Sequence, residues 1–341
     1  QETIVTFGCQ WGTGERLLIR FVIAERKRKC ELDVTEPNDS FECLFQQHCN
    51  YYAVVIRQQS LIYKYSGVMT MARLPTLFIS HGSPMLALEP GTTGPALTRI
   101  GQQLPKPKAI LVISAHWLTQ HPTLTSSAMP ETIHDFGGFP NALYTLQYPA
   151  SGSPELARQV QAMLKKIGLD ARLDAERGLD HGAWVPLRYL YPQADVPVVQ
   201  LSLNPSIAPK LQFALGQFLR ELTGEDVLIL ASGSFTHNLG ELHWDQPDEL
   251  PEAADPYVDE FRDWIIDKIE EQDLDALNNY RKQAPHARRA HPTDEHLLPL
   301  FVALGAADSK EVMRLHKDVA LGTLAMDIFA FGSGSQLLAS E

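Results

Sequence analysis

Four short apolar runs, spaced through the chain after residue 70, constrain the fold more than any other feature. Each is as long as a β-strand and almost continuously apolar, which is typical of strands that are covered on both faces. The runs are LPTLFIS (74–80), AILVISA (109–115), PVVQLSL (197–203) and DVLILAS (226–232). A sheet built from them needs helices on both of its faces.

Amphipathic segments between and after these runs predict those helices. The segment 153–168 has Ser153 as N-cap, Pro154 in the first turn and Gly168 as its C-terminal stop. Apolar residues recur with the period of a helix in three further segments, which are 208–224, 255–273 and 293–306, the last predicted to start at Thr293. The alternation predicts a single α/β domain with a central, mainly parallel or mixed sheet flanked by helices on both faces.

The composition changes near residue 70, which indicates a separate N-terminal segment. Acidic and basic residues balance in 1–70, so the whole net charge of −12 belongs to the rest of the chain. The cysteines all lie in this segment, without a CxxC spacing: Cys9, Cys30, Cys43 and Cys49. We interpret 1–70 as an appended or upstream-translated extension, 71–331 as the catalytic domain, and 332–341, which contains GSGSQ, as a flexible tail.

The overall composition and charge argue against some classes of binding partner. The chain has 341 residues, of which 44% are hydrophobic and 21% charged, as in an ordinary soluble globular protein. No apolar run reaches the roughly 20 residues needed to span a bilayer. The chain is acidic and has no basic stripe, which argues against nucleic acid and anionic membranes as partners. We expect a cytoplasmic protein that acts on a small molecule.

Five histidines, each in a stretch rich in Gly, Ser or Pro, are the candidate functional residues. They are His81 in ISHGSP, His116 in ISAHW, His181 in LDHGAW, His237 in SGSFTHNL and His296 in HPTDEHLLPL. His81 and His116 directly follow two of the predicted strands, and His237 follows a third by a few residues. Imidazoles at the carboxyl ends of several strands are typical of a metal centre or an acid–base site.

Several other chemistries are excluded or disfavoured. Residues 71–341 contain no thiol, which excludes a cysteine nucleophile and a thiolate-bound metal there. The chain has no Gly-x-Gly-x-x-Gly after the first strand, and SGSFTHN is not a Gly-x-Ser-x-Gly elbow. A serine hydrolase that uses Ser83 or Ser234 remains an alternative. The remaining nitrogen and oxygen donors suit Zn²⁺ or Fe²⁺.

The motifs resemble one known family over about residues 71–331. Those motifs, in order along the chain, are HGSP, SAHW, TIHDFGGFP (132–140), DHGAW, SG…HNL and PTDEHLLPL. They are similar in sequence and spacing to those of the class III extradiol ring-cleavage dioxygenases, in particular the 4,5-DOPA extradiol dioxygenase branch. The resemblance implies cleavage of a catechol ring by dioxygen, with iron(II) for catalysis or zinc(II) in the isolated protein.

The resemblance also implies roles for the histidines. It places His81, His116 and His296 on the metal, and it makes His237 either a further ligand or the acid–base residue. His181 corresponds to another active-site histidine. We expect His237 to exchange the catechol proton, with His181 as second candidate. More distant relatives use a glutamate as the third metal ligand, so Glu295 is an alternative to His296 in that role.

Two further functions stay open from the sequence. Imidazole-bound zinc with an open position would activate water, as in a zinc-dependent hydrolase. A non-enzymatic metal-binding protein on the same fold is the other alternative. Among the remaining histidines, we expect His134 to line the pocket or pack in a loop and His291 to end a loop. Three aromatic residues near the key histidines are candidates for a pocket wall: Trp117, Phe139 and Trp184.

Overall fold

The computed structural model describes residues 73–243 and 254–339 in full, and before them the backbone of six short strands. The chain divides into two units, 1–71 and 72–341. The strands of the first unit form one antiparallel sheet in the order β1–β2–β3–β6 and a separate pair, β4–β5. Their bounds are β1 (Glu2–Gln10), β2 (Arg16–Ala24), β3 (Lys29–Asp33), β4 (Glu42–Cys43), β5 (Val54–Val55) and β6 (Gly67–Val68). The side chains of this unit, its four cysteines included, lie outside the described residues.

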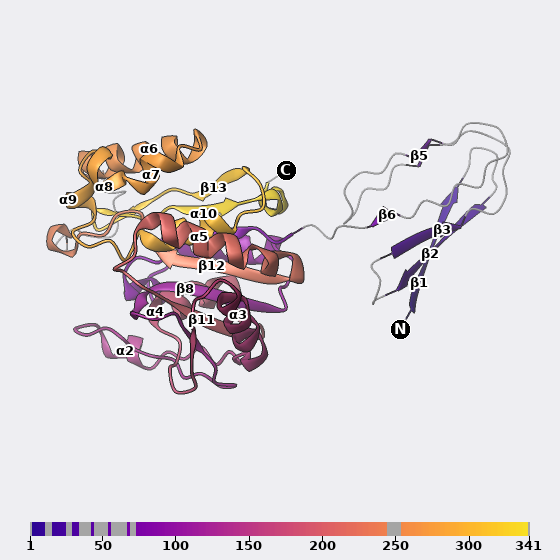
Figure 1. The fold of residues 1–341 in the computed structure, drawn as a ribbon, viewed down its shortest axis with the longest axis horizontal. Coiled ribbons are helices and arrows are strands. Elements are labelled where there is room, and N and C mark those ends of the chain that lie inside the picture. Colours follow the sequence, from indigo (N-terminus) through magenta and orange to yellow (C-terminus); the bar gives the residue numbers. More distant parts are fainter. Residues whose placement is uncertain are drawn as a thin grey trace. The chain divides into compact units, whose positions relative to one another are not determined.

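An eight-stranded sheet organises the second unit (Figure 1). Its strands, given in spatial order, are β10 (Arg172–Asp174), β9 (Thr123–Thr125), β11 (Val198–Leu203), β8 (Ala109–Leu118), β12 (Val227–Gly233), β7 (Thr76–Ser80), β16 (Ile328–Phe331) and β13 (Val312–His316). The four central strands β11, β8, β12 and β7 are mutually parallel, whereas β16 and β13 add antiparallel pairs at one edge. The four predicted strands are therefore confirmed, and they form the middle of a mixed sheet.

Helices cover this sheet. The α-helices are α1 (Thr93–Gln103), α2 (Asn141–Tyr144), α3 (Pro154–Lys166), α4 (His181–Leu190), α5 (Pro209–Leu219), α6 (Pro256–Glu270), α7 (Leu274–Asn278), α8 (Tyr280–Gln283), α9 (Ala287–Ala290) and α10 (Leu298–Ala306). Shorter elements are the 3₁₀ turns η1 (Pro84–Ala87), η2 (Arg220–Glu225), η3 (Leu239–Glu241) and η4 (Ser333–Leu338), and the strand pair β14 (Val319–Ala320) with β15 (Leu324–Ala325). Helix α3 begins as predicted, because Ser153 Oγ accepts the Leu156 N–H at 3.2 Å.

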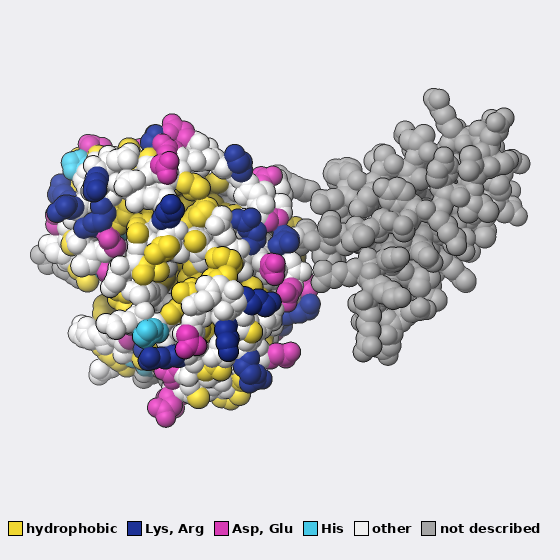
Figure 2. All heavy atoms as spheres, viewed as in Figure 1, with side chains coloured by type: hydrophobic (Ala, Val, Ile, Leu, Met, Phe, Trp, Pro, Cys, Tyr) yellow, Lys and Arg dark blue, Asp and Glu magenta, His cyan; other side chains and the backbone are white. Residues whose placement is uncertain are grey.

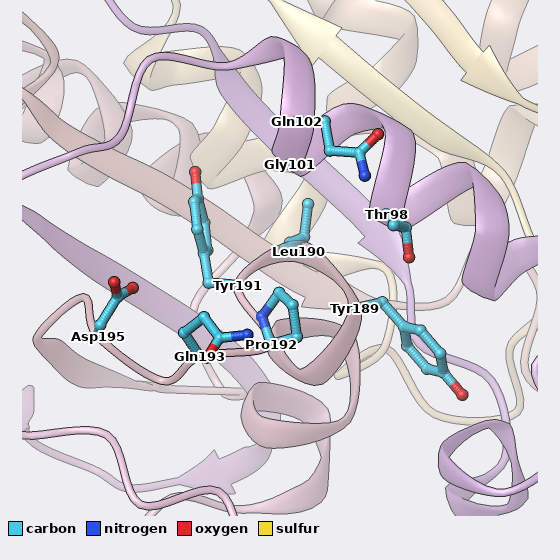
Figure 3. Close-up of a pocket in the computed structure, with 9 residues that line it drawn as sticks. All are labelled: Thr98, Gly101, Gln102, Tyr189, Leu190, Tyr191, Pro192, Gln193 and Asp195. Atoms are coloured by element: carbon cyan, nitrogen blue, oxygen red, sulfur yellow. The ribbon is translucent and has the colours of Figure 1, made fainter.

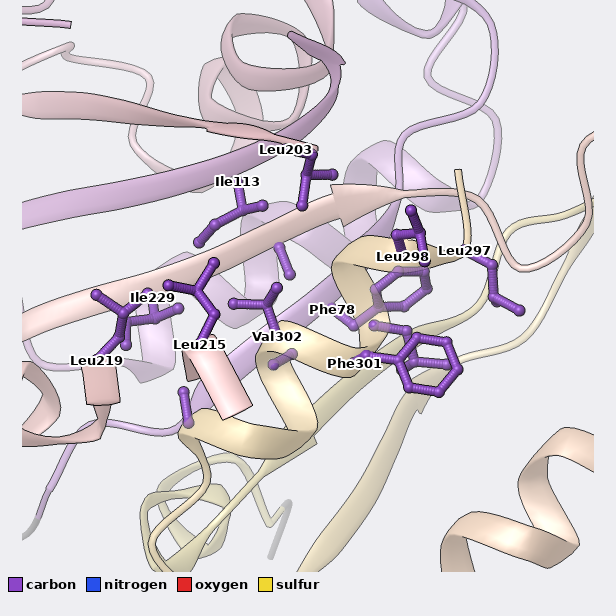
Figure 4. Packing of buried hydrophobic residues seen from close by; sticks show 14 of the residues in the cluster. Phe78, Ile113, Leu203, Leu215, Leu219, Ile229, Leu297, Leu298, Phe301 and Val302 are labelled. Carbon is purple, nitrogen blue, oxygen red and sulfur yellow. The ribbon is translucent and has the colours of Figure 1, made fainter. Parts of the chain in front are cut away.

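Side chains that alternate along the central strands pack into two cores, one on each face of the sheet. On one face, Leu111 and Ile229 lie among apolar residues of α3, α5 and α10. Figure 4 shows Ile229 together with Leu215 of α5 and Val302 of α10. On the other face, their chain neighbours Ile110 and Leu230 pack with residues of α1 and α4. This burial on both faces explains why the strands are almost continuously apolar. The loops at the carboxyl ends of the strands are left to carry polar side chains.

The last long helix differs from its prediction, because it begins at Leu298 and not at Thr293. The carbonyl of His296 accepts the Ser234 N–H at 2.9 Å, so a residue of the β12 loop uses the group that a longer helix would need. Asp294 accepts a hydrogen bond from the Tyr280 hydroxyl at 2.7 Å. Glu295 and His296 therefore lie in a loop before α10 and not on the helix.

The end of the chain also differs from its prediction as a flexible tail. Residues 333–338 form the turn η4, in which Ser335 and Leu338 are buried. A Cβ at Gly334 would lie 2.2 Å from the Arg73 carbonyl oxygen, so the glycine allows this turn to pack against the start of β7. Small residues here serve close packing and not freedom of the chain.

The face of the second unit shown in Figure 2 gathers apolar side chains in the region of α5. Leu211 and Phe218, seven residues apart on that helix, are 53% and 45% exposed. Within the described residues, no helix is long and apolar enough to cross a membrane.

Candidate metal centre

Three histidines from distant parts of the chain turn the same ring nitrogen toward one another. His81 follows β7 directly, and His116 lies near the carboxyl end of β8, two strands away. Their Nε2 atoms are 2.9 Å apart, and Nε2 of His296 is 3.3 Å from that of His116. Two imidazoles bound to one ion at 90–109° would place their nitrogens about 2.9–3.4 Å apart. The spacing therefore fits a single divalent metal ion, and the three side chains are among those that could hold one.

The opposite nitrogen, Nδ1, of each of these histidines lies beside an oxygen. His81 Nδ1 is 2.9 Å from Ser232 Oγ, and His296 Nδ1 is 3.0 Å from Glu295 Oε1. His116 Nδ1 lies 3.7 Å from Asp135 Oδ2, a longer contact. Oxygen partners on the outer nitrogen orient metal-binding histidines and fix which nitrogen carries the proton. In this arrangement Glu295 orients His296 through Nδ1, and His296 is the residue of the two whose nitrogen, Nε2, faces the other histidines.

The two remaining candidate histidines border this group. The ring of His181 lies 3.9 Å from that of His116, measured between ring centroids, and 5.4 Å from that of His81. The ring of His237 stacks on that of His296 at 3.4 Å and 9° between planes. All five histidines that the sequence singled out therefore come together at the carboxyl ends of the central strands.

Local structure explains how α4 delivers His181. Asp180 caps the helix, because its Oδ1 accepts the Ala183 N–H at 3.2 Å. Asp180 is fully buried, and Ser114 and Gln200 also donate hydrogen bonds to its carboxylate, at 2.7 and 2.8 Å. The first residue of α4 is thereby held against β8, the strand that carries His116.

Burial keeps the inner imidazoles neutral. Desolvation and the neighbouring imidazoles lower the pKa of His116 to about 3, although Asp135 and Glu295 oppose the shift. The same causes hold the pKa values of His81 and His296 well below the usual value. Desolvation lowers the pKa of His237 to about 4, against the opposing charge of Glu295. Neutral imidazole is the form that binds a metal ion.

Asp135 is a site residue that the sequence analysis missed. Burial alone would raise the pKa of its carboxyl, but hydrogen bonds from His181 outweigh this and lower the pKa to about 2. The group is therefore a carboxylate beside the histidines. The available signal was its place in TIHDFGGFP, one of the motifs behind the family resemblance, directly after His134.

The other candidates from the sequence, two histidines and three aromatic residues, lie outside the group of five histidines. His134 donates from Nε2 to the Leu146 carbonyl at 3.0 Å, as expected of a loop residue. His291 is buried and bonds the Phe235 carbonyl through Nε2 at 2.9 Å. Trp117 and Trp184 are buried, whereas Phe139 is half-buried and packs edge-on against Phe136, whose ring lies 5.5 Å from that of His181. A further aromatic side chain, Phe136, thus lies beside one of the five histidines, His181.

A separate cavity of about 220 Å³ lies between α1 and the end of α4 (Figure 3). Its lining contains none of the five histidines and consists of Thr98, Gly101, Gln102, Tyr189, Leu190, Tyr191, Pro192, Gln193 and Asp195.

Comparison with known proteins defines the class. Residues 75–323 match the family described as the catalytic LigB subunit of aromatic ring-opening dioxygenase, and the chain belongs to that family. The 4,5-DOPA dioxygenase extradiol of Beta vulgaris is 39% identical over 266 residues, which are 76% of this chain and 96% of that protein. That of Escherichia coli K12 is 39% identical over 264 residues, or 76% of this chain and 95% of that protein. The crystal structure of an uncharacterized protein from Escherichia coli K12 has a TM-score of 0.65 and 32% identity, covering 76% of this chain and 100% of that one.

These matches confirm the resemblance, the α/β fold and the activity that the motifs predicted. The chain is a metal-dependent extradiol ring-cleaving dioxygenase, which uses an aromatic small molecule and dioxygen. The zinc hydrolase and the non-enzymatic protein are thereby the weaker interpretations.

Proposed function

We propose that the chain opens the ring of a DOPA-like catechol with dioxygen, at iron(II) held by His81, His116 and His296. The observation that carries this proposal is the convergence of their three Nε2 atoms, each on a ring whose Nδ1 lies beside a serine or carboxylate oxygen. Zinc(II) suits the same donors and is the metal we expect in protein isolated without added iron. A bound ferrous ion supplies the redox chemistry that lets dioxygen react with the ring.

The remaining side chains of the site bind and deprotonate the catechol. His237 and His181 flank the three inner histidines, and a neutral imidazole at either position accepts a hydroxyl proton and later returns it. Phe136, edge-on to His181, contributes an apolar wall for the aromatic ring. The relatives named as 4,5-DOPA dioxygenases support a substrate of the DOPA class.

The test is anaerobic reconstitution with ferrous iron, followed by dioxygen uptake over a panel of catechols. We expect uptake with L-DOPA and a yellow ring-opened product, and no uptake by the same protein loaded with zinc. If protein fully loaded with iron cleaves no catechol, the proposal fails and zinc-dependent hydrolysis becomes the leading hypothesis.

His237→Ala separates the two roles of His237. As an acid–base residue, His237 contributes about 10²–10⁴ in rate, and the variant should keep its iron. As a fourth ligand, His237 would be needed for iron binding, and iron content would fall in proportion to activity. Iron analysis paired with initial rates at saturating catechol distinguishes the two results.

A further inference from the structure

Asp135 contacts two of the site histidines at once. Its Oδ1 accepts the backbone N–H of His181 at 2.8 Å, and its Oδ2 lies 3.0 Å from Nδ1 of the same residue. The same Oδ2 is 3.7 Å from His116 Nδ1. One carboxylate thus contacts both the backbone and the ring of His181. It also approaches His116, one of the three histidines whose Nε2 atoms face one another. Such a two-point contact restricts both the position and the rotation of the imidazole.

The loop that carries Asp135 is held by hydrogen bonds at the two residues directly before it, Ile133 and His134. Trp184, in the first turn of α4, donates from Nε1 to the Ile133 carbonyl at 2.9 Å. His134 bonds the Leu146 carbonyl at 3.0 Å. Trp184 and His181 belong to the same helix. The bond from Trp184 to the loop therefore fixes the position of the Asp135 carboxylate relative to the imidazole of His181. The contact is therefore part of a built arrangement, in which the side chain of Asp135 is only 18% exposed.

His237, the other acid–base candidate, has no comparable carboxylate among the described residues. Glu295 is near it, but Oε1 of Glu295 already lies 3.0 Å from both the His296 Nδ1 and the Thr293 Oγ1. The ring of His237 stacks on His296 instead. An imidazole held by a carboxylate at Nδ1 has one fixed tautomer, with an unprotonated Nε2, whereas an unheld imidazole exchanges between two.

We propose that Asp135 is a positioning residue that holds His181 in the tautomer protonated at Nδ1, so that its Nε2 is the acceptor of the catechol proton. The inference rests on the proposed function and departs from the expectation that favoured His237. The proton moves from a catechol hydroxyl to Nε2 of His181, and the carboxylate of Asp135 balances the positive charge of the resulting imidazolium. The imidazolium then returns this proton to the ring-opened product.

The first measurement reads the tautomer without turnover. Zinc-loaded protein is diamagnetic, so ¹⁵N spectra of histidine-labelled protein report which nitrogen of His181 carries the proton, with His181→Ala identifying its signals. We expect the Nδ1-protonated form in the wild type. In Asp135→Asn we expect that form to be lost, because the amide can donate to Nδ1. An Nε2-protonated His181 in the wild type, or an unchanged tautomer in the variant, overturns the proposal.

The second measurement asks whether Asp135 acts through His181. With iron(II) and L-DOPA, Asp135→Asn should lower kcat by about 10²–10⁴ while KM and iron content stay near those of the wild type. Asp135→Glu should recover part of kcat. Glu131→Gln, an equal charge change at an exposed residue of the same loop, is the matched control and should match the wild type.

The double variant completes the test. If Asp135 acts through His181, adding Asp135→Asn to His181→Ala should lower kcat no further. A multiplicative loss, or a loss of iron in parallel with kcat, would assign Asp135 to the metal through His116 and overturn the proposal. If the wild type cleaves no catechol, the proposed function fails, and the tautomer measurement alone then decides the role of Asp135.

Discussion

At the scale of the residue, the two nitrogens of an imidazole have different partners in this site. Nε2 atoms of His81, His116 and His296 face one another, and the outer nitrogens face Ser232, Asp135 and Glu295. In the proposed centre, loss of an inner nitrogen would remove a metal ligand, whereas loss of an outer oxygen would only loosen the position of a ring. Outer partners typically contribute about 10–100-fold to metal affinity.

His81→Ala and His116→Ala should each abolish stoichiometric metal binding, because each removes one of three converging nitrogens. Elemental analysis of the purified variants measures this directly. His121→Ala, at an exposed histidine of the loop after β8, is the control and should bind metal as the wild type does. Full metal content in either of the first two variants would remove that residue from the proposed centre.

Glu295→Gln and His296→Ala should differ in severity. We expect Glu295→Gln to weaken metal binding by about 10–100-fold, since the carboxylate lies at the outer nitrogen of His296. His296→Ala should prevent stoichiometric binding. Titration of the apoprotein with zinc against a competing chelator gives both affinities, and the reverse order of severity would make the carboxylate the ligand.

At the level of secondary structure, the close packing of α4 against β8 positions two of the site histidines relative to each other. A Cβ at Gly182, the second residue of α4, would lie 2.5 Å from Ser114 Oγ and 3.1 Å from His116 Cδ2. The helix can approach the strand this closely only with glycine at that position. The same contact joins the strand that carries His116 to the helix that carries His181.

Gly182→Ala should therefore disturb the site more than the fold. We expect weaker zinc binding and a kcat lowered at least tenfold, because the added methyl group displaces His116 or Ser114. Zinc titration and initial rates measure these effects, and circular dichroism checks that the fold is kept. Gly224→Ala is the control, since its Cβ would meet only the Arg73 side chain at an ordinary 3.4 Å. Unchanged metal affinity in Gly182→Ala would show that the helix can shift without consequence for the site.

At the scale of the whole molecule, the site lies entirely in the unit 72–341. The family match begins at residue 75, and every residue of the proposed centre follows it. The core of this unit is formed on both faces of its own sheet. We therefore attribute folding and activity to this unit.

Deletion of residues 1–70 should leave a folded and active protein. Metal content, melting temperature and the rate of catechol cleavage, each compared with the full chain, provide the measurement. An insoluble or metal-free product would make the N-terminal segment a required part of the enzyme.

Local patterns in the sequence are enough to predict the central strands and the histidines that follow them. A strand buried on both faces must be apolar almost throughout, and a parallel sheet brings the carboxyl ends of its strands to one edge, so both features can be predicted from local pattern. The start of α10 could not, because the His296 carbonyl bonds Ser234, a residue 62 positions earlier.

The orientation of the side chains in the site depends on contacts that form only in the folded chain. Asp135 and His181 are 46 positions apart, and no local pattern pairs a loop aspartate with a particular distant ring. Which nitrogen of His81, His116 and His296 faces inward depends on hydrogen bonds to oxygens that packing delivers. Hydrogen bonds act over about 3 Å in space, whatever the separation along the chain. The hydrogen-bond partners of the site histidines can therefore be identified only in the folded molecule.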